Sequence, residues 1–211
     1  MIDQPYKLLE QGSDEWKAAR LGHVSASAVA DVMSKGKTEG SESETRKKYR
    51  LKLVAERLTG ASGDSYSNAS MDWGNEQEPF ARMAYEASRN VLVDKTGFWL
   101  HPSIPMLGVS PDGLVGDDGL VEIKCPNTTT HLEWVFAGKV PAQHMKQIQC
   151  QLWVLDRAWC DFVSFDPRLP KRNQLFIMRT PRDDKLIATM EADVRKFLTE
   201  VDAMIELLNK E

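Results

Sequence analysis

Apolar residues recur at helical spacing in the first part of the chain. Ser13 and Ser25 each precede such a stretch and can accept hydrogen bonds from the free N–H groups of a first helical turn. Gly22 and Gly60 follow two of the stretches, and glycine commonly ends a helix because it adopts the left-handed conformation easily. The pattern predicts helices over residues 16–20, 29–33, 45–58 and 76–88.

The middle of the chain changes to short apolar runs bounded by Gly, Pro or Asp, which is typical of strands. The predicted strands cover residues 91–93, 98–100, 106–110, 120–125, 159–165 and 175–178. One helix, over residues 144–155, interrupts them. Helices followed by strands, a helix and more strands predict an α/β fold of the α+β kind, with a central mixed sheet flanked by helices.

A long amphipathic helix is predicted near the end of the sequence. Thr180 is its expected cap, Pro181 its first residue, and Asp183 and Asp184 favour its N-terminus through the helix dipole. Apolar residues then alternate at four- and three-residue steps over Met190–Leu208. This apolar face either covers one side of the sheet or forms a subunit contact.

Length and composition fit one domain, because the chain has 211 residues of which 42% are hydrophobic. Its expected parts are a helical segment over 1–90, a sheet core over 91–180 and a C-terminal helix over 181–209. No apolar run approaches the roughly 20 residues of a membrane span. Three cysteines without a CxxC pair argue against a disulfide framework, a zinc ribbon or a four-cysteine iron–sulfur cluster. The expected setting is therefore the cytoplasm.

The net charge of −4 disfavours a general nucleic-acid-binding protein. The distribution of charge changes this picture, because residues 35–52 hold seven basic side chains against three acidic ones. A basic surface that could face a nucleic acid is therefore expected.

The candidate chemistry lies in the segment GVSPDGLVGDDGLVEIKCP. Asp112 follows a predicted strand. Glu122 and Lys124 lie two residues apart in the next one, so their side chains share one face. The turn residues Asp117–Gly119 predict a hairpin that brings Asp112 alongside this pair.

Two carboxylates with a lysine beside them suit phosphodiester hydrolysis. Asp and Glu oxygens bind Mg²⁺, which lowers the pKa of bound water and neutralises charge on a phosphate. Lysine can orient the attacking water or stabilise the transition state. The alternative is a surface hairpin in which the same residues form only a cross-strand ion pair.

Two predicted helices offer further candidates. Glu76 and Glu78 could supply a third carboxylate, although acidic residues also favour a helix start for purely structural reasons. Gln143, Gln147 and Gln151 recur every four residues as a polar stripe. Such a stripe is either solvated or holds a water beside a metal.

Arg20 and Ser27 suit a terminal phosphate, because an arginine is a bidentate donor and a serine adds a hydroxyl near a helix start. The alternative for Arg20 is an ion pair with Asp14 or Glu15 at the end of a helix.

Four segments together resemble one known family. They read QGSDEWKAARLGHVSASAVADVM, WGNEQEPFA, GVSPDGLVGDDGLVEIKCP and QIQCQLWV, in that order between residue 11 and about residue 154. The later segment Asp166-Pro167-Arg168 also fits. The chain thus resembles the lambda exonuclease family of phage recombination nucleases, also called YqaJ-type viral recombinases, within the PD-(D/E)xK nuclease superfamily.

The resemblance implies a restriction-endonuclease-like fold and a Mg²⁺-dependent exonuclease, with one or two metal ions and with Mn²⁺ as a substitute. Such an enzyme degrades one strand of linear double-stranded DNA from its 5′ end and leaves a 3′ single-stranded tail. A partner protein that anneals single strands then coats the tail. The resemblance also implies a homotrimer ring around the DNA, encoded by a phage or prophage and acting in the bacterial cytoplasm.

The resemblance assigns roles to individual residues. The implied metal ligands are Glu78, Asp112, Glu122 and the backbone carbonyl of Ile123. The implied catalytic residues are Lys124, Glu122, Asp112 and Gln147. Arg20 and Ser27 match the positions that hold the 5′-phosphate of the DNA. Met71 falls where the family places an apolar wedge that parts the strands.

Two other functions stay open on the sequence alone. One is a structure- or site-specific endonuclease of the same superfamily, which would cut covalently closed circular duplex where an exonuclease leaves it intact. The other is a non-catalytic scaffold that binds DNA ends for recombination. The presence of Asp112, Glu122 and Lys124 together argues against the scaffold.

Overall fold

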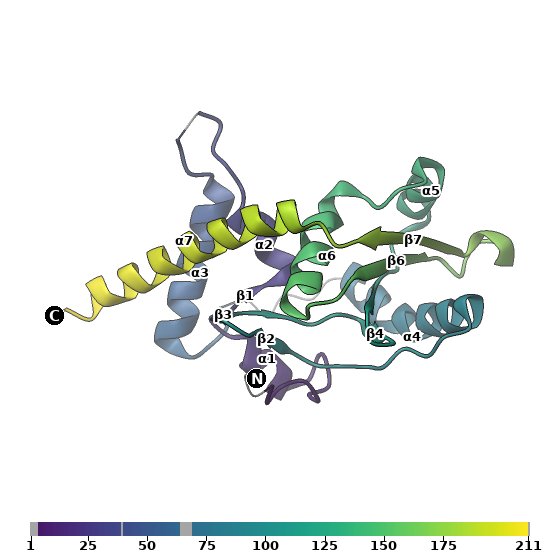
Figure 1. The fold of residues 1–211 in the computed structure, drawn as a ribbon, viewed down its shortest axis with the longest axis horizontal. Helices are drawn as coiled ribbons and strands as arrows, with labels where there is room; N and C mark the ends of the chain where they lie inside the picture. The colour runs from purple at the N-terminus through teal and green to yellow at the C-terminus, as the bar shows by residue number, and fades with distance from the viewer. Residues whose placement is uncertain (1–3, 39, 64–68, 211) are drawn as a thin grey trace.

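The computed structural model describes residues 4–38, 40–63 and 69–210 of the chain. None of the described helices is both long enough and apolar enough to cross a membrane. In chain order the elements are α1 (Asp14–Arg20), β1 (Val24–Ser25), the 3₁₀ helix η1 (Ala26–Ala28), α2 (Val29–Val32), α3 (Glu44–Thr59), α4 (Ala69–Arg89), β2 (Trp99–His101), β3 (Ile104–Val109), β4 (Gly113–Val115), β5 (Gly119–Lys124), α5 (Thr128–Ala137), α6 (Ala142–Val154), β6 (Trp159–Phe165), η2 (Lys171–Asn173), β7 (Leu175–Pro181) and α7 (Asp184–Leu208) (Figure 1).

The strands of the described residues pair as two sheets. The larger sheet has the order β4-β5-β6-β7, and the smaller one has the order β1-β3-β2. β5 and β6 run parallel, whereas β4–β5 and β6–β7 are antiparallel, so the larger sheet is mixed. The predicted class, an α+β fold with helices around a mixed sheet, is confirmed, and the predicted strands divide between two sheets.

Side chains alternate along β5 between two layers of helices. Val121 and Ile123 pack in one apolar cluster with residues of α4. Leu120 packs on the opposite face with Ile148 of α6. Because side chains alternate along a strand, Glu122 shares the face of Leu120. The fold therefore turns this carboxylate toward α6.

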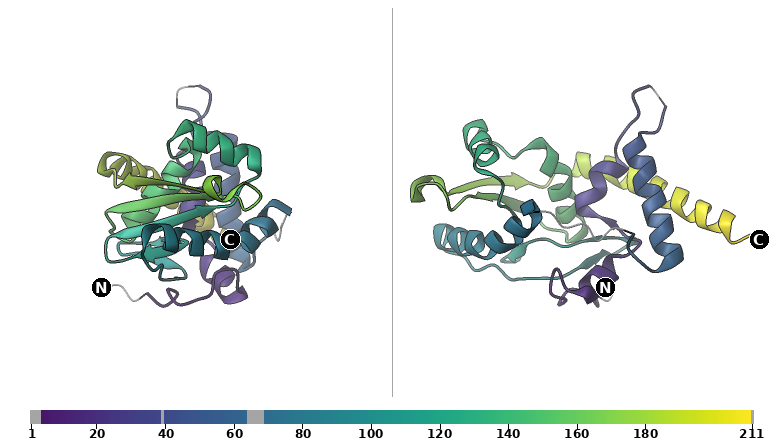
Figure 2. Two further views of the ribbon diagram at one scale, coloured as in Figure 1. Left: turned by 90° about the vertical axis from the view of Figure 1, so that its right-hand side faces the viewer. Right: turned by 180° about the vertical axis from the view of Figure 1, so that it is seen from behind.

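A second group of helices packs around the smaller sheet. Contacts join α2, α3, α6 and α7, and their apolar side chains form one core with β3. Figure 2 shows α3 and α7 against each other at the end of the molecule away from β7. The apolar face of α7, including Met190, Phe197 and Val201, is fully buried in this core. The predicted amphipathic helix thus packs mainly against other helices, while Leu208 in its last turn is exposed.

The start of α7 differs from the prediction. The helix begins at Asp184 with Asp183 as its cap, because the Asp183 side chain accepts hydrogen bonds from two backbone N–H groups of the first turn. Thr180 and Pro181 belong to β7 instead, since they continue the antiparallel ladder with β6.

Other boundaries also differ. Residues 91–93 form no strand, and only the neighbouring Asp94 makes a bridge, to Leu114. The helix predicted over 29–33 is the short α2 preceded by η1, and the Ser25 side chain caps neither. α5 was not predicted, since three consecutive threonines have low helix propensity. Its signal was Asn127, which caps it.

The predicted hairpin forms with a different first strand. β5 pairs with β4, in which Gly113 lies opposite Val121, whereas β3 belongs to the smaller sheet. Ser110, Pro111 and Asp112 separate β3 from β4, because proline cannot donate to a strand ladder. Asp112 therefore lies directly before the hairpin strand.

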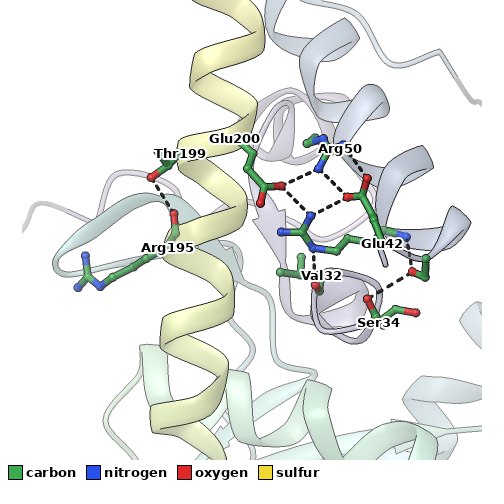
Figure 3. A network of polar contacts seen from close by, with 9 residues as sticks. Val32, Ser34, Glu42, Arg50, Arg195, Thr199 and Glu200 are labelled. Atoms are coloured by element: carbon green, nitrogen blue, oxygen red, sulfur yellow. Dashed lines mark hydrogen bonds and ion pairs between the residues drawn. The ribbon is translucent and has the colours of Figure 1, made fainter. Parts of the chain in front are cut away.

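A network of charges fastens the segment before α3 to α7, and Figure 3 shows Glu42, Arg50 and Glu200 converging. Arg46 and Arg50 each contact both carboxylates, with nitrogen–oxygen distances of 2.5–2.6 Å. Burial opposes ionisation of Glu200, but hydrogen bonds from the two arginines outweigh it and hold its pKa below the ordinary value of 4.5. Two bases of the predicted basic surface are thus engaged within the protein.

Replacing Glu200 with alanine is expected to lower the free energy of unfolding by about 1–3 kcal/mol at pH 7, because two mostly buried arginines lose one of their two partners. Since the pKa of Glu200 is lowered by folding, its contribution is complete above pH 4.5 and shrinks as the pH falls below that value. Urea unfolding at pH 7 and pH 3.5 measures both effects. Glu206→Ala, an exposed position on the same helix, serves as the control. Equal stability of wild type and Glu200→Ala at pH 7 would contradict the prediction.

Candidate active site

Glu122 and Lys124 form the centre of the candidate site. Lys124 Nζ lies 2.5 Å from Glu122 Oε1, as two side chains on one face of a strand allow. Glu122 is fully buried, whereas the Lys124 side chain keeps 31% of its surface exposed. The pair is a partly exposed lysine that rests on a buried carboxylate, and not the solvated surface ion pair of the alternative interpretation.

Two glutamines of α6 hold the Glu122 carboxylate. Gln147 Nε2 donates to Glu122 Oε1 at 2.6 Å, and Gln151 Nε2 donates to Oε2 at 2.8 Å. They project from one helix face because they are four residues apart. Gln143, the remaining member of the stripe, is exposed. The structure brings Gln147 to the site and adds Gln151, which the sequence marked only as part of the stripe.

Asp112 joins the site through the backbone of β5. Its Oδ2 accepts a hydrogen bond from the N–H group of Ile123 at 2.6 Å. Among the described residues, nothing donates to the other oxygen of this carboxylate. Ile123, whose carbonyl is an implied metal ligand, is thereby fixed in the strand between Glu122 and Lys124.

Glu78 comes from α4, on the other side of the sheet. Its carboxylate forms an ion pair with Arg82, one turn later on the same helix. Glu76, the other candidate, is exposed. Within the described parts of the chain, no three His, Cys, Asp or Glu side chains are already grouped as a metal site. Among the described residues, Glu78 forms no hydrogen bond or ion pair with Asp112 or Glu122, but it lies close enough to Asp112 to raise the pKa of that carboxyl group.

The site has an excess of negative charge. Burial and the carboxylate of Glu122 raise the pKa of Asp112 well above its ordinary value, and Glu78 adds to this while Lys124 opposes it. Burial lowers the pKa of Lys124, but Glu122 and Asp112 outweigh burial, so the pKa is raised and the amine is protonated. Burial, Glu78 and Asp112 raise the pKa of Cys125 to about 12, which keeps this thiol neutral.

This donor set fits a hard divalent cation. Carboxylate and carbonyl oxygens are the ligands that Mg²⁺ prefers, and Glu78, Asp112, Glu122 and Ile123 supply both kinds. A cation would also offset the repulsion between carboxylates that raises the pKa of Asp112.

Arg20, at the end of α1, lies on an aromatic ring. Its guanidinium carbon is 4.0 Å from the centre of the Trp16 ring, a cation–π contact. The alternative pairing with Asp14 is not formed, because Asp14 pairs with Lys17 at 3.0 Å. No described acidic residue forms an ion pair with Arg20, so none competes with an anion for its donors.

Ser27 is exposed, and its hydroxyl lies 3.1 Å from that of Ser25. The N–H group of Ser25 donates to the Tyr49 hydroxyl at 3.3 Å. Tyr49 is also close enough to Arg20 to act on its charge. Arg20 and Ser27 therefore lie in one neighbourhood around Tyr49, although they form no hydrogen bond with each other.

A contact that the sequence did not reveal links the helix of Arg20 to the segment that carries Asp112. Trp16 Nε1 donates to Ser110 Oγ at 3.0 Å, and Ser110 lies two residues before Asp112. Arg20 stacks on the same Trp16 ring. The only signal in the sequence was a polar residue at the end of a buried strand, which is too common to single out.

Met71 lies in the first turn of α4 with 51% of its surface exposed. Seven residues, or two helical turns, bring it onto the same helix face as Glu78 about 10 Å away along the axis. The role of Met71 as a wedge stays a prediction.

Replacing Gln151 with glutamate is expected to destabilise the fold by about 2–4 kcal/mol at pH 7, because it places a second carboxylate against the buried Glu122. Gln143→Glu makes the same change at an exposed position of the same helix and is expected to alter stability little. Thermal melting of both variants measures the difference. Equal melting temperatures would show that Gln151 does not hold Glu122.

The chain is similar to one protein family and to solved structures of exonucleases. Residues 15–158 match the YqaJ-like viral recombinase domain, whereas no curated protein sequence matches the chain. The alkaline exonuclease LHK-Exo from Laribacter hongkongensis is 47% identical, with a TM-score of 0.87 over 94% of this chain and 97% of that one. The structure of LHK-Exo in complex with dAMP gives the same TM-score and coverage at 48% identity.

A more distant protein shares the fold. The phage-related exonuclease from Haemophilus somnus 129PT has a TM-score of 0.69 at 18% identity, over 88% of this chain and 96% of that one. The family match covers well over half of the chain, and it includes the segments with Arg20, Glu78, Asp112, Glu122 and Lys124. The resemblance inferred from the sequence is therefore confirmed, and the chain belongs to the YqaJ-like viral recombinase family of nucleases.

Proposed function

We propose that this protein is a Mg²⁺-dependent exonuclease that degrades one strand of linear double-stranded DNA in the 5′ to 3′ direction. The product is a 3′ single-stranded tail for phage-type recombination in the cytoplasm of a bacterial host. The observation that carries the proposal is the buried Glu122 carboxylate, which two glutamines and Lys124 hold beside Asp112. The 47% identity to an alkaline exonuclease over 94% of the chain supports it.

Lys124 is the proposed catalytic cation. The Lys124 side chain is partly exposed and its ammonium group is fixed on Glu122, so it can orient a water for attack or stabilise the charge that develops on the phosphate. Gln147 and Gln151 keep the Glu122 carboxylate in place and so fix the position of the lysine. The N–H group of Ile123 fixes Asp112 in the same way.

The residues that would hold the metal are Glu78, Asp112, Glu122 and the carbonyl of Ile123. A bound Mg²⁺ supplies an activated water and neutralises negative charge on the phosphate. The raised pKa of Asp112 supports this assignment, because burial and the Glu122 carboxylate disfavour its charged form, and a bound divalent cation would favour that form.

Arg20 and Ser27 are proposed to bind the 5′-terminal phosphate. The guanidinium is oriented by Trp16 and has no acidic partner among the described residues, and the Ser27 hydroxyl is exposed. Each cleavage exposes a new 5′-phosphate, so the same residues would draw the strand forward and set the polarity. Met71 would part the two strands ahead of the site.

One digestion experiment tests the proposal. Linear duplex is labelled at either end of one strand and incubated with and without Mg²⁺, with Mn²⁺ as a second metal and closed circular duplex as a second substrate. We expect mononucleotides from the 5′ end, no product without metal and an intact circle. Nicking or cutting of the circle would instead indicate an endonuclease. Binding of ends without any hydrolysis would indicate the scaffold.

The proposed assembly is a homotrimer ring that works with a single-strand annealing protein. A chain with a net charge of −4 has little electrostatic hold on DNA, so encirclement is a reasonable way to stay bound. Multi-angle light scattering at micromolar concentration is expected to give three times the monomer mass of 23.8 kDa. A monomer under these conditions would contradict the ring.

A further inference from the structure

Arg168 and Trp73 form a stacked pair that the mechanism above does not use. The guanidinium carbon of Arg168 lies 4.6 Å from the centre of the Trp73 ring. Trp73 belongs to α4, five residues before Glu78, and Arg168 follows β6 in the segment Asp166-Pro167-Arg168. The contact therefore joins the helix of one implied metal ligand to the connection between β6 and β7.

A buried carboxylate holds this arginine in place. Asp166 is fully buried, and its Oδ1 accepts from Arg168 Nε at 2.7 Å and from the Arg168 backbone N–H group at 3.0 Å. Its Oδ2 accepts from the Thr128 hydroxyl at 2.6 Å. The Arg168 side chain nevertheless keeps 44% of its surface exposed. A fully buried acid thus orients a cation that faces solvent.

The pairing of β5 with β6 fixes where Arg168 lies relative to Glu122 and Lys124. β5 and β6 are parallel, with Lys124 opposite Ser164, so both strands end at the same edge. Arg168 Nη2 donates to the carbonyl of Pro126 at 3.0 Å, two residues after Lys124. Figure 1 shows α4 and the connection between β6 and β7 in the same half of the molecule. Arg168 therefore stands at the edge where the strand with Glu122 and Lys124 ends.

Two donors at this edge lack acceptors. Among the described residues, Arg168 Nη1 donates to none, while its other two nitrogens are engaged. Trp73 Nε1 is buried and has no hydrogen-bond acceptor within the described parts of the chain. A planar guanidinium stacked on an aromatic ring presents its free donors in a fixed direction, which suits the oxygens of a phosphate. It also supplies positive charge beside an acidic site that a DNA strand must approach.

We propose that Arg168, held over Trp73 by Asp166, binds a backbone phosphate of the DNA strand that is being cleaved. The inference rests on the proposed function, because the strand must cross the Glu122–Lys124 pair for Arg168 to reach it. The phosphate bound here is an internal one, distinct from the terminal phosphate assigned to Arg20. The competing interpretation is that Arg168 only tightens the connection after β6.

Neutral linkages in the DNA separate the two interpretations. A set of linear duplexes carries one methylphosphonate each, at successive linkages on both sides of the first scissile bond, and kcat and KM are measured for wild type and Arg168→Ala. We expect Arg168→Ala to lower kcat/KM at least about tenfold, because a hydrogen bond to a charged group is lost. At the linkage that Arg168 binds, a methylphosphonate should lower kcat/KM of the wild type by a factor similar to that of the Arg168→Ala substitution. The same methylphosphonate should not lower kcat/KM of Arg168→Ala any further. If the methylphosphonate slowed wild type and Arg168→Ala by the same factor at every linkage, the proposal would be overturned.

Two further variants show whether an effect is specific to the guanidinium of Arg168. Arg172→Ala removes an exposed arginine from the same connection and should behave like the wild type. Arg168→Lys keeps the positive charge but not the planar guanidinium. Its rate of DNA digestion should lie between those of the wild type and Arg168→Ala. If Arg168→Ala melts below the assay temperature, Arg168→Lys takes its place in the methylphosphonate series, with the same two outcomes.

A binding measurement separates this inference from the proposed function. Fluorescence anisotropy with the same duplexes in EDTA reports affinity without hydrolysis. If the wild type digests no linear duplex, the proposed function fails, and the anisotropy series still decides whether Arg168 recognises one phosphate. If the wild type digests DNA and Arg168→Ala matches it in rate and affinity at every linkage, only the inference fails.

Discussion

Lys124→Ala is expected to lower the rate of DNA hydrolysis by about 10²–10³-fold, the typical loss when one preorganised electrostatic group is removed from an active site. The reason is the position of the ammonium group, which belongs to a partly exposed side chain and is fixed at 2.5 Å from a buried carboxylate. Glu122→Gln should cause a loss of similar size, because it removes the charge that holds the lysine. Initial rates on linear duplex with Mg²⁺ measure both.

The control for this prediction is Lys185→Ala. Asp183-Asp184-Lys185 has the same acid-x-Lys spacing, but it lies at the exposed start of α7 and should tolerate the change. Thermal melting of each variant shows whether the fold is intact. A folded Lys124→Ala that retained more than about a tenth of the activity, a loss below about 1.4 kcal/mol, would falsify the assignment.

Arg20→Ala is expected to slow digestion of DNA with a 5′-phosphate by about 10- to 100-fold, because a charge-assisted contact contributes about 1.5–3 kcal/mol. DNA with a 5′-hydroxyl should be digested slowly by the wild type already, so the variant should narrow the gap between the two ends. Initial rates on the two kinds of end, for wild type and variant, measure this directly.

Lys17→Ala is the matched control, because Lys17 lies one turn earlier on α1 and pairs with the exposed Asp14. It should leave the preference for phosphorylated ends unchanged. Metal binding by the Asp112 and Glu122 carboxylates should also be unchanged in Arg20→Ala, since no contact joins Arg20 to either carboxylate. Slowing of both kinds of end by one common factor would show that Arg20 is structural or contacts the DNA backbone generally.

Local patterns predicted the strands that carry the chemistry. The structure confirms β6 over residues 159–165 and places Glu122 and Lys124 on one face of β5, because alternation along a strand is a local property. It also confirms the turn that brings Asp112 to β5, although the first hairpin strand follows Asp112 and does not precede it. These features depend on residues close in sequence, so the sequence alone was sufficient to predict them.

Features that depend on contacts between residues far apart in the sequence could not be predicted from local patterns. The end of β7 is set by pairing with β6 and overrides the helix-start signal of Thr180 and Pro181. The bond from Gln151 to Glu122 requires α6 to pack on β5, and the helical stripe does not say which glutamine faces inward. The link from Trp16 to Ser110 spans 94 residues and has no local signal.

The parallel pairing of β5 with β6 has a consequence for the cell that synthesises this protein. Glu122 and Lys124 leave the ribosome first, and the groups that hold them arrive later with α6 and β6. Parallel partners always lie across such a crossover, and long-range pairing of this kind forms late. A nascent or truncated chain that ends before Phe165 thus lacks an assembled centre. We therefore expect a fragment that ends before Phe165 to hydrolyse no DNA.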